Sequence, residues 1–321
     1  MGYTGVGTAL VTPRNTRGNI NIPHYVSLLE RQVKAGIDFV VVLGTTGEAE
    51  FLPKHNSSGV RTDYRRELVR KTVETLVTLG NREDVPVVVG TSAIDPEEVI
   101  ERTLSAQELL ADAALITPPP YVKPRQNGIV NHYHAIARAM EDSVIESFPL
   151  IAYNVPGRVG VNIEPETLRL LLRIPSIIGI KEASGNMEQM EAYARVRREE
   201  GRDNLYEDYF YIWSGDDATA FQAVQQYGAD GVISVVSNVA PKRMGEVIHA
   251  GIKRKEEGPS LDQALQPLYT ASMRAGNPQS IKYMMERAGL KVGMPHSSLG
   301  TPTREEKKVI DRLVQQAGEL R

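Results

Sequence analysis

Short runs rich in β-branched residues alternate with amphipathic stretches over most of the chain, and this alternation restricts the fold more than any other feature of the sequence. The runs are TALVT (8–12), DFVVVLG (38–44), PVVVGT (86–91), AALIT (113–117), PLIAYN (149–154), IIGIKE (177–182), YFYIWSG (209–215) and DGVISVV (230–236). Each is followed by a stretch with helical spacing, such as IPHYVSLLERQVKAG. Eight such alternations predict an α/β fold, a parallel (β/α)8 TIM barrel, with an open doubly wound sheet as the alternative.

The strand pattern ends before about residue 245, and the remainder of the chain reads as helix. Helical patterns cover 262–274, 278–289 and 303–319. We therefore expect two domains, a catalytic barrel over residues 1–240 and a C-terminal helical domain over residues 241–321. Polar insertions near 54–64 and 198–208 are typical of surface loops.

Composition limits the class of protein. Apolar residues make up 41% and charged residues 24% of the 321 residues, and the net charge is −3, with both signs interspersed. This balance does not favour a nucleic-acid or membrane partner. No targeting signal or run of membrane-spanning length is evident, so a cytoplasmic protein is expected. The absence of cysteine excludes disulfides, thiolate zinc sites and cysteine nucleophiles.

Polar residues collect where the predicted strands end. GTTGE (44–48), TPPPY (117–121), YNVPGR (153–158) and SGDD (214–217) each follow a strand, and Lys181 lies at the end of another. In TIM barrels the catalytic residues lie at the carboxyl ends of the strands and on the loops that follow them. These motifs are therefore candidates for one active site.

Lys181 is the most informative of these residues. Side chains alternate along a strand, so if Lys181 points into the barrel then Glu182 faces the helices and is not its partner. Burial disfavours the ammonium form, and the neutral amine attacks carbonyl groups. Gly179, one pleat below, is expected to leave room for a ligand. The alternative is a lysine whose ammonium group reaches the solvent at the barrel mouth.

The neighbouring motifs supply further candidates. Tyr153 is either a core aromatic residue or, beside an imine-forming lysine, a group that transfers protons. Arg158 follows a Val-Pro-Gly turn and suits a carboxylate, although a surface ion pair is the alternative. Thr45 and Thr46, flanked by glycines, offer hydroxyl and backbone N–H groups to an anion.

Other polar residues have simpler interpretations. His132 and His134 are two residues apart and face opposite sides of a helix, so we interpret both as solvated rather than as metal ligands. Asp216 and Asp217 stand where a helix begins, and capping explains them better than a metal does. We therefore expect no metal site.

Six motifs, in this order and spacing, resemble the dihydrodipicolinate synthase family of pyruvate-dependent class I aldolases, a group that includes N-acetylneuraminate lyase. They are GTTGE, YNVPGR, GIKEASGN, SGDD, GVISVVSNVAP and, at 277–282, NPQSIK. The resemblance extends from GTALVTP to the C-terminal helices. It implies a (β/α)8 barrel with a C-terminal helical domain.

The resemblance also implies roles for individual residues. Lys181 matches the lysine that forms a Schiff base with pyruvate, and Tyr153 matches the central proton-transfer tyrosine. The remaining matches are Thr45 as the relay threonine, Thr46 at the pyruvate carboxylate, Arg158 at the carboxylate of the second substrate, Gly215 and Ile233 as backbone positions lining the pocket, and Tyr121 as the tyrosine that enters the neighbouring subunit's site. Here PPPYVKP replaces the two adjacent tyrosines usual in the family.

The implied function is a 4-hydroxy-tetrahydrodipicolinate synthase reaction of the diaminopimelate and lysine pathway, in which pyruvate and L-aspartate-4-semialdehyde condense. The covalent imine replaces any cofactor. A homo-oligomer, a tetramer built as a dimer of dimers, is expected. The alternatives are a related pyruvate-dependent aldolase, such as N-acetylneuraminate or 2-keto-3-deoxy sugar acid lyase, and a non-catalytic ligand-binding homologue.

Feedback inhibition is where the chain departs from the resemblance. Family members inhibited by lysine bind it through an asparagine, a tyrosine and histidines, and here the matching positions are Ile94, Pro120 and Lys54. Glu98 alone is retained. We therefore expect an enzyme that is insensitive to millimolar lysine.

Overall fold

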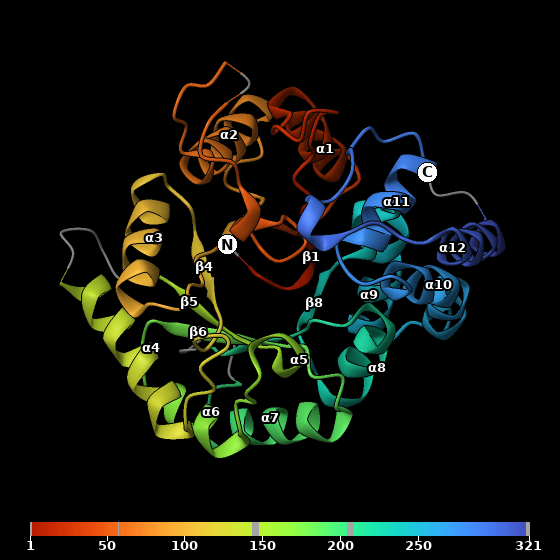
Figure 1. Cartoon of the computed structure of the whole chain (residues 1–321). Coiled ribbons are helices and arrows are strands. Elements are labelled where there is room, and N and C mark those ends of the chain that lie inside the picture. The colour runs from red at the N-terminus through yellow and green to blue at the C-terminus, as the bar shows by residue number, and fades with distance from the viewer. Residues whose placement is uncertain (1, 57, 143–147, 204–208, 319–321) are drawn as a thin grey trace. The chain divides into compact units, whose positions relative to one another are not determined.

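The computed structural model describes residues 2–56, 58–142, 148–203 and 209–318. Its eight parallel strands form a closed barrel in chain order, which confirms the predicted fold class. They are β1 (Gly5–Ala9), β2 (Phe39–Val42), β3 (Val87–Gly90), β4 (Ala113–Ile116), β5 (Leu150–Asn154), β6 (Ile177–Glu182), β7 (Tyr211–Ser214) and β8 (Gly231–Ser234). In Figure 1 their colours run from red at β1 to blue-green at β8.

The chain divides into two compact units. Unit 1 comprises residues 1–87 and 234–321, and unit 2 comprises residues 88–233. The predicted boundary at residue 240, between the barrel and the C-terminal helical domain, differs from this division and stays a prediction.

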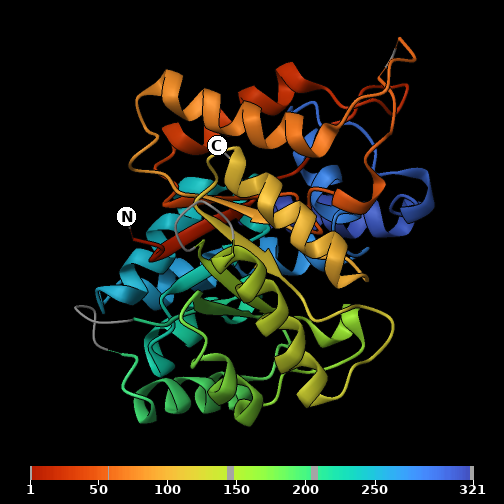
Figure 2. The same cartoon turned by 90° about the vertical axis from the view of Figure 1, so that its left-hand side faces the viewer.

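Unit 1 carries the first two strands and the C-terminal helices. Its helices are α1 (Ile22–Lys34), α2 (Tyr64–Leu79), α9 (Pro241–Ile252), α10 (Gly258–Met273), α11 (Gln279–Arg287) and α12 (Arg304–Ala317), with the 3-10 turns η1 (Ala49–Phe51), η2 (Val236–Asn238) and η3 (Ser297–Leu299). Helices α1 and α2 lie side by side (Figure 2), and α10 packs against both α9 and α12. The helices predicted after residue 260 are present, although residue 319 of the last one lies outside the described residues.

The first strand begins earlier than the sequence pattern predicts, at Gly5 instead of Thr8. The glycines at its start look like a turn, but Gly7 pairs with Phe39 of β2. A Cβ atom on Gly7 would lie 2.1 Å from the Phe39 ring, so this strand position requires a residue without a side chain.

Unit 2 carries the strands that hold most of the predicted site residues. Its helices are α3 (Pro96–Glu108), α4 (Gln126–Glu141), α5 (Pro156–Val159), α6 (Pro165–Leu171), α7 (Met187–Glu199) and α8 (Asp217–Tyr227). Side-chain caps fix where several of them begin, because a cap satisfies the first N–H groups of a helix. Asn186 accepts from the N–H groups of Glu188 and Gln189, and Asp216 accepts from Ala218. The predicted capping role of Asp216 is confirmed.

The two insertions differ in how far they can be described. Residues 54–56 and 58–63 form a largely exposed loop closed by a β-bridge between His55 and Arg61, as expected of a surface loop, whereas Tyr64 begins α2 and is buried. Of the predicted 198–208 insertion, residues 204–208 lie outside the described residues. Among the described residues, no helix is long and apolar enough to cross a membrane.

Candidate active site

Lys181 and Tyr153 lie on neighbouring strands of unit 2. Strands β5 and β6 are parallel, and their register places Tyr153 opposite Lys181 and Asn154 opposite Glu182. The Lys181 Nζ atom lies 4.4 Å from the centroid of the Tyr153 ring. The Tyr153 ring is therefore next to the amine that the sequence predicts to be the nucleophile.

The Lys181 side chain is buried without a carboxylate. It is 6% exposed, and no described carboxylate of unit 2 forms an ion pair with it. Glu182 points away, as predicted, and accepts hydrogen bonds from Asn154 and Gln189. A buried lysine amine next to an aromatic ring, at the carboxyl end of a barrel strand, is placed where a nucleophile of a TIM barrel is expected.

Gly215 lies against the lysine side chain. Its N–H donates to the Glu182 carbonyl oxygen at 2.6 Å. A Cβ atom at this position would lie 2.9 Å from Lys181 Cε and 2.5 Å from Ala183 Cβ. A residue without a side chain thus lets the turn after β7 pass close to the amine.

The expectation that Gly179 leaves room for a ligand is wrong. A Cβ atom there would lie 2.6 Å from the Trp213 ring, which fills the space above Gly179. Trp213 is fully buried and stacks on Tyr211 with ring centroids 5.4 Å apart. The glycine makes room for the indole ring of the neighbouring strand.

Arg158 and Tyr121 lie on two loops that contact each other. Arg158 is exposed on the short helix α5, and its N–H donates to the Val155 carbonyl oxygen. Tyr121 is 84% exposed, and its backbone has a positive φ of 74°. The Tyr121 N–H donates to the Val159 carbonyl oxygen at 3.2 Å, so the loop after β4 rests on the α5 turn.

Two other predicted positions in unit 2 are placed differently. Ile233 of β8 is fully buried, and its role in lining the pocket through its backbone stays a prediction. His132 contradicts the prediction that both histidines are solvated, because it is 5% exposed whereas His134 is exposed. Burial lowers the pKa of His132 to about 4, so the ring is neutral at physiological pH.

Unit 1 carries the GTTGE turn. Thr45 is exposed, whereas Thr46 is 3% exposed. The Thr46 hydroxyl oxygen accepts a hydrogen bond from Asn277 Nδ2 at 2.9 Å. The sequence analysis did not single out Asn277 as a site residue, although it is the first residue of the NPQSIK motif.

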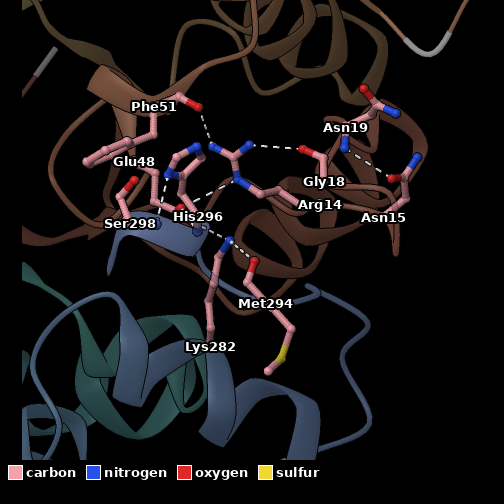
Figure 3. A network of polar contacts seen from close by, with 10 residues as sticks. All are labelled: Arg14, Asn15, Gly18, Asn19, Glu48, Phe51, Lys282, Met294, His296 and Ser298. Atoms are coloured by element: carbon pink, nitrogen blue, oxygen red, sulfur yellow. Dashed lines mark hydrogen bonds and ion pairs between the residues drawn. The ribbon is translucent and has the colours of Figure 1, made fainter. Parts of the chain in front are cut away.

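Glu48, the last residue of the turn, lies in a buried ionic cluster (Figure 3). We call Arg14, Glu48 and Lys282 the buried triad. Lys282 Nζ forms an ion pair with Glu48 Oε1, and Arg14 Nε lies 3.4 Å from Glu48 Oε2. Glu48 Oε2 also accepts from the His296 N–H at 2.7 Å. The triad therefore joins the GTTGE turn to both the N-terminal and the C-terminal segments of unit 1.

The other contacts of Arg14 complete the cluster. Its two terminal nitrogens donate to the carbonyl oxygens of Gly18 and Phe51, and the Phe51 ring stacks on His296 with centroids 4.7 Å apart (Figure 3). A cavity of about 1130 Å³ adjoins it within unit 1. None of the predicted site residues lines this cavity.

Lys282 is the other buried lysine, and its surroundings differ from those of Lys181. Burial lowers the pKa of Lys282, while the charge of Glu48 opposes the shift. Its ammonium group is 1% exposed and ion-paired. Lys282 is therefore a structural cation, and Lys181 is the better candidate for a nucleophile.

Comparison with known proteins identifies the family of the chain. The model of the dihydrodipicolinate synthetase family matches residues 2–317. A 4-hydroxy-tetrahydrodipicolinate synthase of Kosmotoga olearia is 36% identical over 321 residues, covering 99% of this chain and 100% of its own.

Solved structures show the same similarity. The chloride-inhibited dihydrodipicolinate synthase of Acinetobacter baumannii, complexed with pyruvate, has a TM-score of 0.86 and 31% identity, with 99% of each chain covered. A monomeric dihydrodipicolinate synthase variant has a TM-score of 0.85 and 30% identity, with 98% of this chain and 97% of that one covered. The predicted resemblance is confirmed: the chain is an enzyme that belongs to the dihydrodipicolinate synthetase family.

Proposed function

We propose that the chain condenses pyruvate with L-aspartate-4-semialdehyde through an imine on Lys181, which is the 4-hydroxy-tetrahydrodipicolinate synthase reaction. The observation that carries this proposal is the buried amine of Lys181, which lies 4.4 Å from the Tyr153 ring centroid and forms no ion pair with a described carboxylate of its unit. The names of the relatives agree with it.

The reaction begins with the neutral amine of Lys181. Its nitrogen attacks the keto carbon of pyruvate, and the resulting carbinolamine loses water to give the protonated imine. Loss of a methyl proton gives the enamine, whose carbon forms a bond with the aldehyde carbon of the second substrate. The amine of that substrate then attacks the imine carbon and displaces Lys181, which closes the ring.

The steps require proton transfers, which the neighbouring residues carry out. Tyr153 exchanges protons with the carbinolamine and the enamine, and Thr45 and a partner chain's Tyr121 relay them. Thr46 binds the pyruvate carboxylate, and Arg158 binds the carboxylate of the semialdehyde.

Gly215 and Ile233 line the pocket through their backbones. The protonated imine is itself the electrophile, so neither a metal nor a cofactor is needed. We place the enzyme in the cytoplasm, as a homo-oligomer that assembles as a tetramer.

Borohydride reduction tests the imine. Pyruvate and borohydride together should add one reduced adduct to each chain, and peptide mapping should place it on the peptide that holds Lys181. Lys181→Ala should give no adduct, and Lys123→Ala, which changes an exposed lysine, should react as the unaltered chain does. An adduct on Lys123 or Lys282 would contradict the assignment.

An acceptor assay tests the second substrate. Turnover of pyruvate with the semialdehyde, and none with sugar aldehydes, is expected. Turnover with a sugar aldehyde alone would identify a related pyruvate-dependent aldolase, and no adduct at all would identify a ligand-binding homologue.

A further inference from the structure

A buried group of polar side chains lies on the opposite side of β5 and β6 from Lys181 and Tyr153. Asn154 directly follows Tyr153, and Glu182 directly follows Lys181. Successive side chains of a strand point to opposite faces, so these two residues face away from the predicted nucleophile. They are fully buried or nearly so, at 0% and 3% exposure.

Asn154 uses both ends of its side-chain amide. Its Nδ2 atom donates to Glu182 Oε2 and to Asn162 Oδ1, each at 2.8 Å. Its Oδ1 atom accepts from the Ile163 N–H at 2.8 Å. One side chain therefore binds the neighbouring strand and the segment that follows α5.

Glu182 is held by neutral donors. Its Oε2 atom also accepts from Gln189 Nε2 at 2.8 Å, and its Oε1 atom accepts from the Ser184 N–H at 2.6 Å. Its carbonyl oxygen accepts from the Gly215 N–H. The carboxylate thus joins β5, the turn after β6 and the first turn of α7.

The same group closes the turn that carries Arg158. The chain leaves β5 at Asn154, passes through Arg158 and returns at Asn162 and Ile163, both of which bind the Asn154 amide. Asn162 also exchanges hydrogen bonds with Gln189, at 2.6 and 3.0 Å. Both ends of the turn are therefore fixed to one side chain.

We infer that Asn154 and Glu182 are positioning residues for the reaction: they fix Tyr153 against Lys181, and Asn162 extends the same group to fix the Arg158 turn. This inference rests on the proposed function. Its physical basis is that a one-residue shift between the strands would turn Tyr153 or Lys181 to the wrong face. Nothing in the sequence alone distinguishes Asn154 and Glu182 from ordinary strand-end polar residues.

A role confined to stability is the alternative, and kinetics separate the two. Glu182→Gln keeps the shape of the side chain but replaces an acceptor oxygen by a donor, so at least one N–H group among its partners loses its acceptor. We expect the rate of pyruvate-imine formation, followed by borohydride trapping, to fall about 10- to 100-fold, the scale that misplacing a reacting group produces. The KM for the semialdehyde should change little.

Asn162→Ala should give a different signature. It removes the Asn162 side-chain bonds to Asn154 and Gln189, one of the two ties of the Arg158 turn, and leaves the bonds of Asn154 to Glu182 and Ile163 in place. We expect the KM for the semialdehyde to rise about tenfold, with imine formation from pyruvate alone unchanged. Two variants of one hydrogen-bonded group would then affect two different substrates.

Thr103→Val is the matched control for the loss of a buried hydrogen bond. In unit 2, Thr103 donates to Thr91 Oγ1 at 2.9 Å and is fully buried. This variant should lose a comparable amount of stability and keep the trapping rate and both KM values. If Glu182→Gln yields no folded protein, Gln189→Leu removes one donor to the same oxygen and should slow trapping about threefold or more.

The outcomes separate this inference from the proposed function. If the unaltered chain gives no adduct with pyruvate, the proposed function fails and the inference fails with it. If the unaltered chain reacts and the Glu182→Gln or Gln189→Leu variant traps pyruvate at the same rate, the proposed function stands and the positioning role is refuted. If Thr103→Val changes the trapping rate as much as Glu182→Gln does, Asn154 and Glu182 contribute to stability and not to positioning.

Discussion

At the scale of single residues, two buried lysines differ in their neighbours. Lys282 forms an ion pair with the Glu48 carboxylate, whereas Lys181 has the Tyr153 ring beside it and no ion pair with a described carboxylate of its unit. An ion pair stabilises the charged form of a buried lysine. A lysine in a strand is therefore informative only together with what faces it.

Gly215 offers a residue-scale test of how closely the lysine is held. In Gly215→Ala the new methyl group would lie 2.9 Å from Lys181 Cε, so the side chain or the turn must move. We expect imine formation with pyruvate to slow by about 100-fold, because displacing a nucleophile by about 1 Å has an effect of this size. Trapping with borohydride at successive times after pyruvate is added measures the rate of imine formation.

The control for this change is Gly128→Ala in α4. A Cβ atom there has an open neighbourhood, with its nearest contact 3.5 Å away. The variant should keep the trapping rate and gain about 0.5–1 kcal/mol of stability from helix propensity. If Gly215→Ala leaves the rate of imine formation unchanged, the turn after β7 can move to accommodate the methyl group without displacing Lys181.

At the scale of elements, the sequence predicts where the strands lie but not which side chains pack against them. Short, nearly continuous apolar runs mark all eight strands, because strands of a parallel barrel are buried on both faces. The start of β1 lies outside the predicted run because Gly5 and Gly7 are not β-branched, and the Phe39 ring that fills the space beside Gly7 belongs to another strand. Gly179 was misread for the same reason, since its neighbour Trp213 belongs to another strand.

The site shows the same limit. Lys181, Tyr153 and Arg158 could be proposed from motifs, since their positions at strand ends follow from the pattern. Asn154 and Glu182 could not, because their importance lies in hydrogen bonds to segments distant in sequence. His132 was placed on the wrong side because helical spacing separates two faces without saying which is buried.

His132 in α4 predicts how stability depends on pH. Its pKa is about 4 in the folded chain and near 6.5 when unfolded, so between these values the unfolded chain binds more protons. The contribution of His132 to the free energy of unfolding is complete above pH 6.5 and is lost as the pH falls toward 4, with a total on the order of 3 kcal/mol.

Urea unfolding of His132→Leu should show a free energy of unfolding that depends less on pH over that range. His134→Leu, at an exposed position of the same helix, should keep the original dependence, and a parallel change in both variants would contradict the assignment.

The buried triad predicts an order of destabilisation between two variants. Removing Lys282 leaves Arg14 and Glu48 as a balanced pair, whereas removing the charge of Glu48 leaves two buried cations facing each other. Glu48→Gln should therefore lower the free energy of unfolding by about 3–5 kcal/mol and Lys282→Met by less. Denaturant unfolding measures both.

The exposed pair of Lys308 and Glu305 supplies the comparison for the triad. These side chains are 61% and 78% exposed, and Glu305→Gln should cost under about 0.5 kcal/mol. A larger loss for Lys282→Met than for Glu48→Gln would mean that charge balance does not govern this cluster.

At the scale of the whole molecule, Tyr121 predicts an assembly. A tyrosine that is 84% exposed at a backbone position with φ of 74° is unusual unless another surface covers it. We expect sedimentation to show an oligomer, and Tyr121→Phe to lower kcat about tenfold or more while leaving the assembly intact. A fully active monomer would refute both the assembly and the relay role of Tyr121.

The last prediction concerns regulation of the whole enzyme by lysine. In unit 2, two positions that match polar ligands of lysine in the family carry Ile94, which is 55% exposed, and Pro120. Glu98, the retained residue, already forms an ion pair with Arg102 at 2.5 Å. A bound zwitterion needs partners for its carboxylate and both amines, and each unpaired group costs about 1–3 kcal/mol.

Losing an amide and a phenol should therefore weaken binding by more than about 100-fold, equivalent to roughly 3 kcal/mol. Activity at subsaturating pyruvate should stay unchanged in millimolar L-lysine. Ile94→Asn, which restores the amide, should show at least weak inhibition, whereas Ile252→Asn, a change at another partly exposed isoleucine, should show none. Half-inhibition of the unaltered enzyme below about 1 mM, a binding free energy near −4 kcal/mol, would mean that lysine is held by residues other than these.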